Sequence, residues 1–118
     1  MSIQDLDIVQ ESVTAAEFTV YTAPTTSNFK SAKITGGLCS NPSATDTELT
    51  VWLVKFGDTA DLTNQYMPPK VVFSGDIDLM TPIVGAGVTV KAGDFIVTKA
   101  SVAGNLNVKL SITEKYAD

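Results

Sequence analysis

Hydrophobic and polar residues alternate along much of this chain with a period of two, which is the period of a β-strand. The clearest example is the C-terminal segment 105–116. Its apolar residues are Leu106, Val108, Leu110 and Ile112, with a polar residue between each pair. This pattern predicts a strand with one buried face and one solvated face.

A second strand is predicted at 48–56, where both faces are apolar. One face carries Leu49, Val51 and Leu53, and the other carries Trp52, Val54 and Phe56. Such a strand is typical of the centre of a buried sheet. The alternative is that the Trp52 face meets another subunit, because large aromatic residues also favour interface cores.

Three further segments have weaker strand patterns. Segment 17–21 predicts Phe18 and Val20 inward, and segment 29–40 predicts an inward set of Ala32, Ile34, Gly36 and Leu38. Segment 70–80 is interrupted by Gly75, which indicates one bent strand or two short ones.

Turn residues separate these segments at 40–46, 57–69, 91–94 and 102–105. The last two turns flank 94–101, so we expect the final two strands to form an antiparallel hairpin. The 57–69 segment is long enough to carry an interface. Gly85 and Gly87 lack the lysine and helix signal of a phosphate loop and predict a turn or an irregular edge strand.

No segment has the sustained spacing of an amphipathic helix, and the strand signals recur roughly every 8 to 12 residues. We therefore predict an all-β fold, an antiparallel β-sandwich of jelly-roll type with about eight short strands. Residues 1–16 are expected to form an N-terminal arm or an edge strand. Residues 17–118 are expected to form a single β-sandwich domain.

The composition of the chain argues against several classes of function. The chain has 118 residues, a net charge of −5, no histidine and one cysteine, Cys39. The acidic balance argues against nucleic-acid binding, which depends on neutralising phosphates. Without histidine, zinc and copper sites and the common nucleophile–base pairs are not expected. No run of about 18 apolar residues is present, so we expect no membrane partner.

Carboxylates and aromatic residues are the remaining candidates for chemistry. Asp76 and Asp78 lie two apart, and a small hydrolase using them is a weak alternative to a solvated surface. A calcium site at Asp58 and Asp61, or at Asp76 and Asp78, is a further weak alternative, because the spacing of these residues does not match an EF-hand loop. We expect no catalytic residue, metal or cofactor. A glycan-binding module remains an alternative of another class, with candidate aromatic residues Tyr21, Trp52, Tyr66 and Tyr116.

The order of strands and turns resembles small bacteriophage virion proteins of β-sandwich fold. The likeness spans roughly residues 17 to 113 and combines strand and turn motifs without a catalytic signature. The matching positions are Tyr21, Thr22, Pro24, Cys39, Asn41, Thr50 to Val54, Ala92 to Asp94, Ile96, Ala100, Ser101, Ala103, Gly104, Asn107, Val108 and Ser111. Two departures are Ala23 and Thr25 around Pro24, and Val90 before the turn at 91–94.

The resemblance implies a structural component of a virion, synthesised in the host cytoplasm. Capsid decoration is the leading expectation, and a neck, baseplate or tail-fibre position is the alternative. Its partners would be other virion proteins and copies of itself, with a trimer suggested by the family. The candidate subunit contacts are Ile3, Leu6, Ile8 and Val9 in the first segment and Leu62, Tyr66 and Met67 in the long loop. The alternative for Tyr66 and Met67 is that they cap the core.

Overall fold

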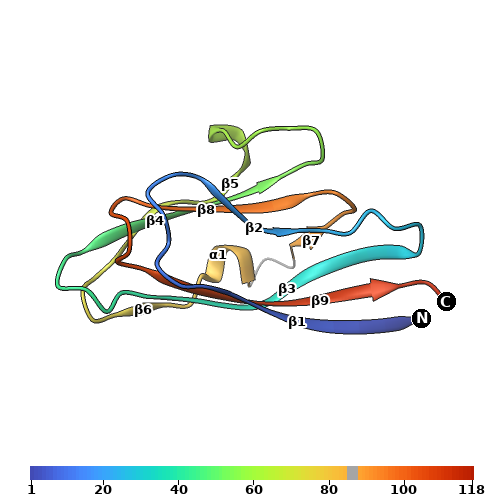
Figure 1. The fold of residues 1–118 in the computed structure, drawn as a ribbon, viewed down its shortest axis with the longest axis horizontal. Helices are drawn as coiled ribbons and strands as arrows, with labels where there is room; N and C mark the ends of the chain where they lie inside the picture. The colour runs from blue at the N-terminus through green and yellow to red at the C-terminus, as the bar shows by residue number, and fades with distance from the viewer. Residues whose placement is uncertain (85–87) are drawn as a thin grey trace.

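The computed structural model describes residues 1–84 and 88–118. These residues form two antiparallel β-sheets that pack face to face in an elongated sandwich of 49 × 25 × 22 Å (Figure 1). The chain termini meet at one end of the sandwich, where the Met1 amino group contacts the Asp118 carboxylate. The predicted all-β sandwich is confirmed.

The first sheet has the strand order β1-β9-β3-β6, and β7 also pairs with β3. Its strands are β1 (Ser2–Gln10), β3 (Phe29–Ser40), β6 (Ile77–Asp78), β7 (Thr89–Val90) and β9 (Asn107–Tyr116). The second sheet has the order β2-β8-β4-β5. Its strands are β2 (Phe18–Thr22), β4 (Thr47–Val54), β5 (Gln65–Val72) and β8 (Phe95–Ala100). Two short helices, η1 (Leu62–Asn64) and α1 (Thr81–Val84), complete the described elements.

Most connections pass from one sheet to the other, and this gives the jelly-roll order. The exceptions are the link from β4 to β5 and the link from β6 to β7. The predicted hairpin of the last two strands is wrong, because β8 lies in the second sheet and β9 in the first. The turn residues at 102–105 predicted a bend, but they did not indicate that the chain continues in the other sheet.

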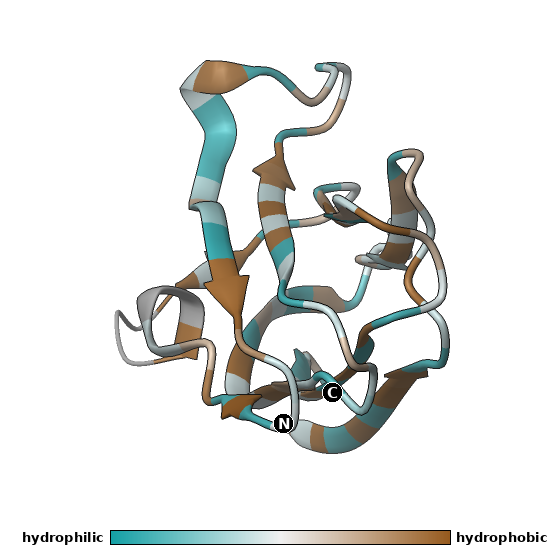
Figure 2. Cartoon of the chain, turned by 90° about the vertical axis from the view of Figure 1, so that its left-hand side faces the viewer, coloured by the Kyte–Doolittle hydropathy of each residue, from teal (hydrophilic) through white to brown (hydrophobic). Residues whose placement is uncertain are grey.

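The core lies between the two sheets. Figure 2 shows hydrophobic and hydrophilic residues alternating along the strands. All four apolar residues predicted inward in the C-terminal segment are buried. The inward face of β4 is buried in the same cluster through Leu49, Val51 and Leu53. On its opposite face, Trp52 and Val54 form a second cluster with Val97. β4 is therefore apolar on both faces within this chain, as a central strand should be.

Two side chains predicted to point inward are exposed. In β3 the register shifts between Ile34 and Gly36, so Cys39 is buried while Leu38 is 37% exposed. The extra residue changes which side chains face the core after the bulge, which lies beside the Gly36–Gly37 pair. Phe18 is 49% exposed on the edge strand β2, ahead of the bulge in that strand. The other inward residue predicted there, Val20, is partly buried against the core.

The 57–69 segment is shorter as a loop than expected, because β5 already begins at Gln65. Segment 70–80 contains two strands, as one alternative held, but they belong to different sheets. Gly75 has a φ of +79° in the turn between them, a conformation that favours glycine. The turn or irregular edge strand expected at Gly85 and Gly87 lies outside the described residues.

Candidate functional site

Strand β1 is a long, regular edge of the first sheet. It pairs with β9 without a register shift from Ser2 opposite Tyr116 to Gln10 opposite Val108. Among the described residues, no strand pairs with its other side. β1 contains no proline and no bulge, the devices that usually protect an edge strand from pairing with another chain. Its free backbone groups can therefore accept an added strand.

The two faces of β1 differ. Leu6 and Ile8 are partly buried and pack against the core of their own chain. Ile3 and Val9 are each 61% exposed on the opposite face. We name Ile3 and Val9, together with the free backbone of β1, the β1 edge surface. Of the four contacts predicted here, the structure thus places two in the solvent and two against the core.

Aspartates lie between the exposed apolar residues of β1. Asp5 accepts a hydrogen bond from the Thr113 hydroxyl at 2.8 Å, and Asp7 accepts one from Ser111 at 3.2 Å. Both bonds join β1 to β9 on the outer face of the sheet. The β1 edge surface therefore combines apolar side chains with negative charge.

The candidates of the long loop are not brought together. Leu62 is 84% exposed in η1, where the Asp61 side chain accepts a hydrogen bond from the Thr63 amide and caps the helix. Tyr66 is 41% exposed, but Met67 is 1% exposed and belongs to the core. The structure places Met67 in the alternative role, packed inside its own chain. Leu62 and Tyr66 stay predicted contacts.

The edge at β5 is protected, unlike β1. Pro68 and Pro69 interrupt the pairing of β5 with β4, and proline has no N–H to offer an added strand. The Lys70 ammonium lies 2.6 Å from the Asp78 carboxylate of β6 and so joins the edges of the two sheets. Asp78 is held by this pair, and Asp76 lies outside β6, so the two do not form an isolated carboxylate pair.

Exposed apolar side chains gather around β6 at the opposite edge of the first sheet from β1. Phe73, Ile77 and Leu79 are 58%, 62% and 67% exposed. We name these three residues the β6 edge surface. The sequence did not predict this surface, because the pattern of segment 70–80 indicated strands but not which of their faces is buried. The usual pattern of buried apolar and exposed polar residues is reversed here, because the partly buried Asp78 lies between two exposed apolar residues.

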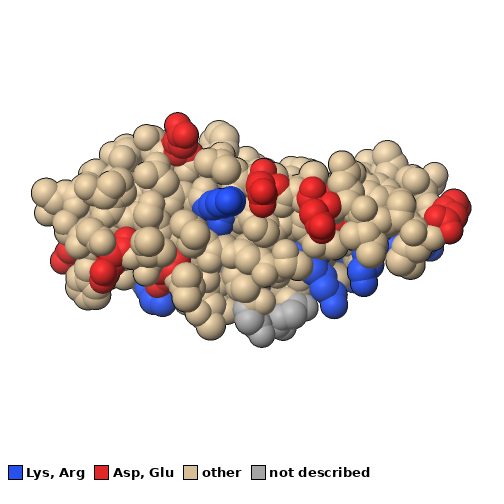
Figure 3. Space-filling view, turned by 90° about the horizontal axis from the view of Figure 1, so that it is seen from below, with Lys and Arg blue, Asp and Glu red and all other residues tan. Residues whose placement is uncertain are grey.

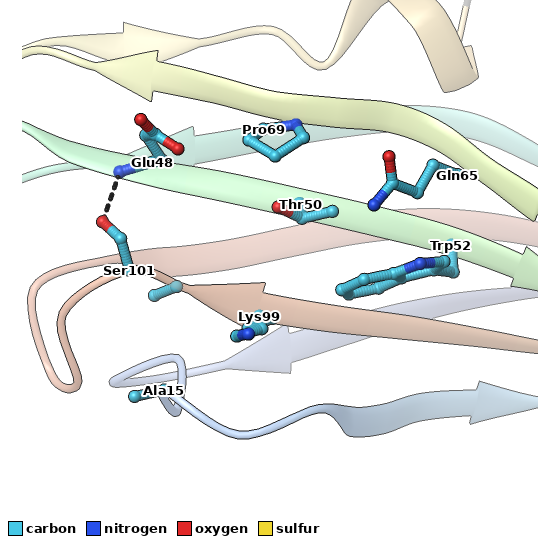
Figure 4. A pocket seen from close by; sticks show the side chains of 9 residues that line it. Ala15, Glu48, Thr50, Trp52, Gln65, Pro69, Lys99 and Ser101 are labelled. Atoms are coloured by element: carbon cyan, nitrogen blue, oxygen red, sulfur yellow. Dashed lines mark hydrogen bonds between the residues drawn. The ribbon is translucent and has the colours of Figure 1, made fainter. Parts of the chain in front are cut away.

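The outer face of the second sheet carries a groove of about 410 Å³ (Figure 4). β4 contributes its floor, with β5 on one side and β8 on the other. The lining residues are Ala15, Glu48, Thr50, Trp52, Gln65, Pro69, Lys99, Ala100 and Ser101. Glu48 donates its backbone N–H to the Ser101 hydroxyl at 2.9 Å, which ties β4 to the end of β8.

Trp52 has an unusual position in this groove. The residue is 5% exposed, and its Nε1 has no hydrogen-bond partner among the described residues. A buried donor without an acceptor costs about 1–3 kcal/mol. Trp52 was a predicted core or sugar-stacking residue, and the structure adds the unpartnered nitrogen.

The other aromatic candidates do not join Trp52. The Tyr21 hydroxyl donates to Glu114 at 2.6 Å inside the sandwich, and Tyr116 donates to the same carboxylate at 2.7 Å. Burial and the hydrogen bond to Glu114 raise the pKa of Tyr21, so its hydroxyl remains a donor. These residues stabilise the interior and do not form a surface platform.

Cys39 is fully buried, and burial raises the pKa of its thiol to about 12. A thiol of this kind is a poor nucleophile. In the described part of the chain, no group of three or more histidine, cysteine, aspartate or glutamate residues could hold a metal ion. No described helix is long and apolar enough to cross a membrane. Acidic and basic side chains are interspersed on the face seen in Figure 3.

No protein-family model matches the chain, and no curated protein matches its sequence. Among solved structures, it is similar to one of Bacillus endospore appendages, which form a novel family of disulfide-linked pili. That match has 16% identity and a TM-score of 0.55, and it covers 98% of this chain and 87% of the other.

Two structures from infectious bursal disease virus also match. The Gx strain structure has 16% identity, a TM-score of 0.39 and coverage of 94% of this chain and 32% of the other. The T13 viral particle has 11% identity, a TM-score of 0.42 and coverage of 95% and 30%. This chain spans about a third of those two viral chains. The likeness to the pilus protein shows the fold that the two chains share, a β-sandwich.

Proposed function

We propose that this chain is a non-enzymatic structural subunit that binds its neighbours through the two edges of its first sheet. One observation carries the proposal. The β1 edge surface and the β6 edge surface are both apolar and exposed, and the strand order places them at opposite edges. A subunit with two different contact surfaces can bind a neighbour on each side.

The charges of β1 favour contact between unlike surfaces. Asp5 and Asp7 share the outer face with Ile3 and Val9. If two β1 strands paired about a two-fold axis at Leu6, Asp5 of one copy would lie opposite Asp7 of the other. Like charges directly opposite each other destabilise a strand pair. This register is unfavourable, and we propose that the β1 edge surface meets a different surface, either the β6 edge of a second copy or a strand of another protein.

Contacts between unlike surfaces are head-to-tail, and they close into a ring when the rotation between neighbours permits. Such contacts would produce a homo-oligomer, and the resemblance to phage virion proteins suggests a trimer. Each stable contact would bury about 1,200–2,000 Å². Leu62 and Tyr66 add exposed side chains for contacts with other subunits.

The finer proposal is a bacteriophage virion protein that decorates and stabilises a capsid, with a neck, baseplate or tail-fibre position as the alternative. The sequence resemblance supports it, and so does the presence of surfaces suited to repeated contacts. A disulfide-linked pilus is a poorer fit for this chain. Its one cysteine could link two chains and no more, and that cysteine, Cys39, is buried.

Light scattering after size-exclusion chromatography tests the assembly surfaces. We expect the unmodified chain to form an oligomer, and Val9→Lys to shift it to monomer because a charge enters an apolar contact. Val102→Lys is the matched control, since Val102 is 44% exposed but lies in neither edge surface. An oligomer that Val9→Lys and Ile77→Lys both leave intact would contradict the proposal, as would a monomeric unmodified chain that is also absent from purified particles.

A further inference from the structure

The groove on the outer face of the second sheet has the size of a ligand site. Its volume of about 410 Å³ lies within the range of small-molecule sites, which is about 300–1,000 Å³. Figure 4 shows Gln65 and Pro69 along one side, Thr50 and Trp52 in the middle and Lys99 on the other side. The groove lies on a different sheet from the β1 edge surface and the β6 edge surface.

Trp52 supplies the observation that points to a ligand. Its side chain is almost completely buried, yet Nε1 finds no acceptor among the described residues. Figure 4 shows this nitrogen on the edge of the indole nearer to Gln65, and both residues line the groove. Buried polar groups in proteins are nearly always hydrogen-bonded. A ligand oxygen that enters between Gln65 and Trp52 would satisfy the N–H.

The remaining polar side chains indicate what the ligand is. Thr50, Gln65 and Ser101 can each donate and accept hydrogen bonds, as the hydroxyl groups of a sugar do. Glu48 and Lys99 contribute opposite charges, and neither forms an ion pair with a described residue. The groove therefore has no net charge and offers no preference for a phosphate or another anion.

A peptide fits the groove less well than a sugar. Peptides that bind sheets usually add a strand at an edge, where free backbone groups are available. Here the groove lies over the face of β4, whose backbone is already paired with β5 and β8. The neighbouring edge strand β5 carries Pro68 and Pro69, which cannot donate. We infer that the groove over Trp52 binds a neutral saccharide, held by a hydrogen bond to the indole N–H and by the polar side chains around it.

Fluorescence titration tests this inference directly, because Trp52 is the only tryptophan of the chain. The probes are maltotetraose, cellotetraose and chitotetraose, with heparin as a charged saccharide and a mixed random heptapeptide pool as a peptide probe. We expect a saturable change in emission with at least one neutral probe, with a dissociation constant of about 0.1–1 mM. Gln65→Ala should weaken that binding about tenfold, the effect of losing one hydrogen bond.

Calorimetry with Trp52→Phe removes the N–H while keeping an aromatic ring, and it should also weaken binding about tenfold. Lys109→Ala is the control, because this exposed residue lies on β9 of the other sheet. Thermal melts show whether each variant is folded. If Trp52→Phe does not fold, Gln65→Ala still tests the inference. The inference is overturned if no neutral probe saturates the signal, if only heparin or the peptides do, or if a folded Gln65→Ala or Trp52→Phe variant binds as tightly as the unmodified chain.

Discussion

Replacing Tyr21 by phenylalanine removes a single hydroxyl from the interior of the sandwich. That hydroxyl donates to Glu114 at 2.6 Å, and the two residues are 7% and 4% exposed. The loss leaves one oxygen of a buried carboxyl group without its donor, and water has little access to replace it. Hydrogen bonds to charged groups contribute about 1.5–3 kcal/mol, so we expect Tyr21→Phe to lower the free energy of unfolding by about that amount.

Urea unfolding followed by circular dichroism measures this loss as a lower midpoint with an unchanged slope. The expected change in melting temperature is a decrease of about 5–15 °C. Tyr66→Phe is the control, since Tyr66 is 41% exposed, and we expect it to change the unfolding free energy by less than about 0.5 kcal/mol. If Tyr21→Phe costs no more than Tyr66→Phe, the buried hydrogen bond to Glu114 does not stabilise the fold as described.

Further predictions concern the backbone, the core and alkaline pH. Gly93→Ala should destabilise the fold more than Gly57→Ala in thermal melts: both glycines have positive φ, but only at Gly93 would a Cβ meet a neighbour, Phe56 Cδ2 at 2.5 Å. Equal losses would show that Phe56 moves aside freely. Leu110→Ala should cost about 2–5 kcal/mol in urea unfolding, because Leu110 is fully buried, and a cost below about 1 kcal/mol would contradict its central place in the core. Burial raises the pKa of the Cys39 thiol from 9.0 to about 12. The contribution of the neutral thiol to the free energy of unfolding is therefore complete below pH 9 and is lost as the pH rises from 9 towards 12. Cys39→Ala should reduce the fall in unfolding free energy over that window by about 1.4 kcal/mol per pH unit, and identical slopes would refute the assignment.

Sequence patterns predicted the strands wherever alternation was unbroken. The C-terminal strand and the two apolar faces of β4 up to Val54 are correct, because side chains alternate between the two faces of a regular strand. Phe56 was predicted on the second face, but it lies beyond the end of β4 and is 73% exposed. The alternation shifts by one residue after a bulge, and this is why Leu38 was placed on the wrong side. Phe18 is exposed on an edge strand, and the local pattern does not show which strands lie at an edge. The local sequence pattern also does not show which strands pair when they are far apart in the chain. The turn before β9 was recognised, but the change of sheet depends on contacts with β1 and β3.

The candidate surfaces were predicted in part. Ile3 and Val9 are exposed as expected, because they occupy the outward positions of an edge strand. The sequence left Met67 open between a subunit contact and a place in the core, and the structure places it in the core because β5 has already begun at Gln65. The groove over Trp52 could not be predicted, because its walls come from three strands whose order is set by the whole fold.

Assembly through the β1 edge should also change the hydrogen exchange of this strand. The β1 edge is long and has no proline or bulge, so its backbone can pair with another chain. Hydrogen exchange of the β1 amides should slow when subunits assemble, while β5, with its two prolines, should change little.

The proposed virion role is tested most directly by quantitative mass spectrometry of particles purified from a lysate of the cells in which this chain is made. A structural subunit must be present in the particle in fixed proportion to the other virion proteins. We predict that the chain is present, in hundreds of copies if it decorates the capsid and in far fewer copies at a neck, baseplate or fibre. Its absence from intact particles, while the chain is abundant in the lysate, would contradict the account.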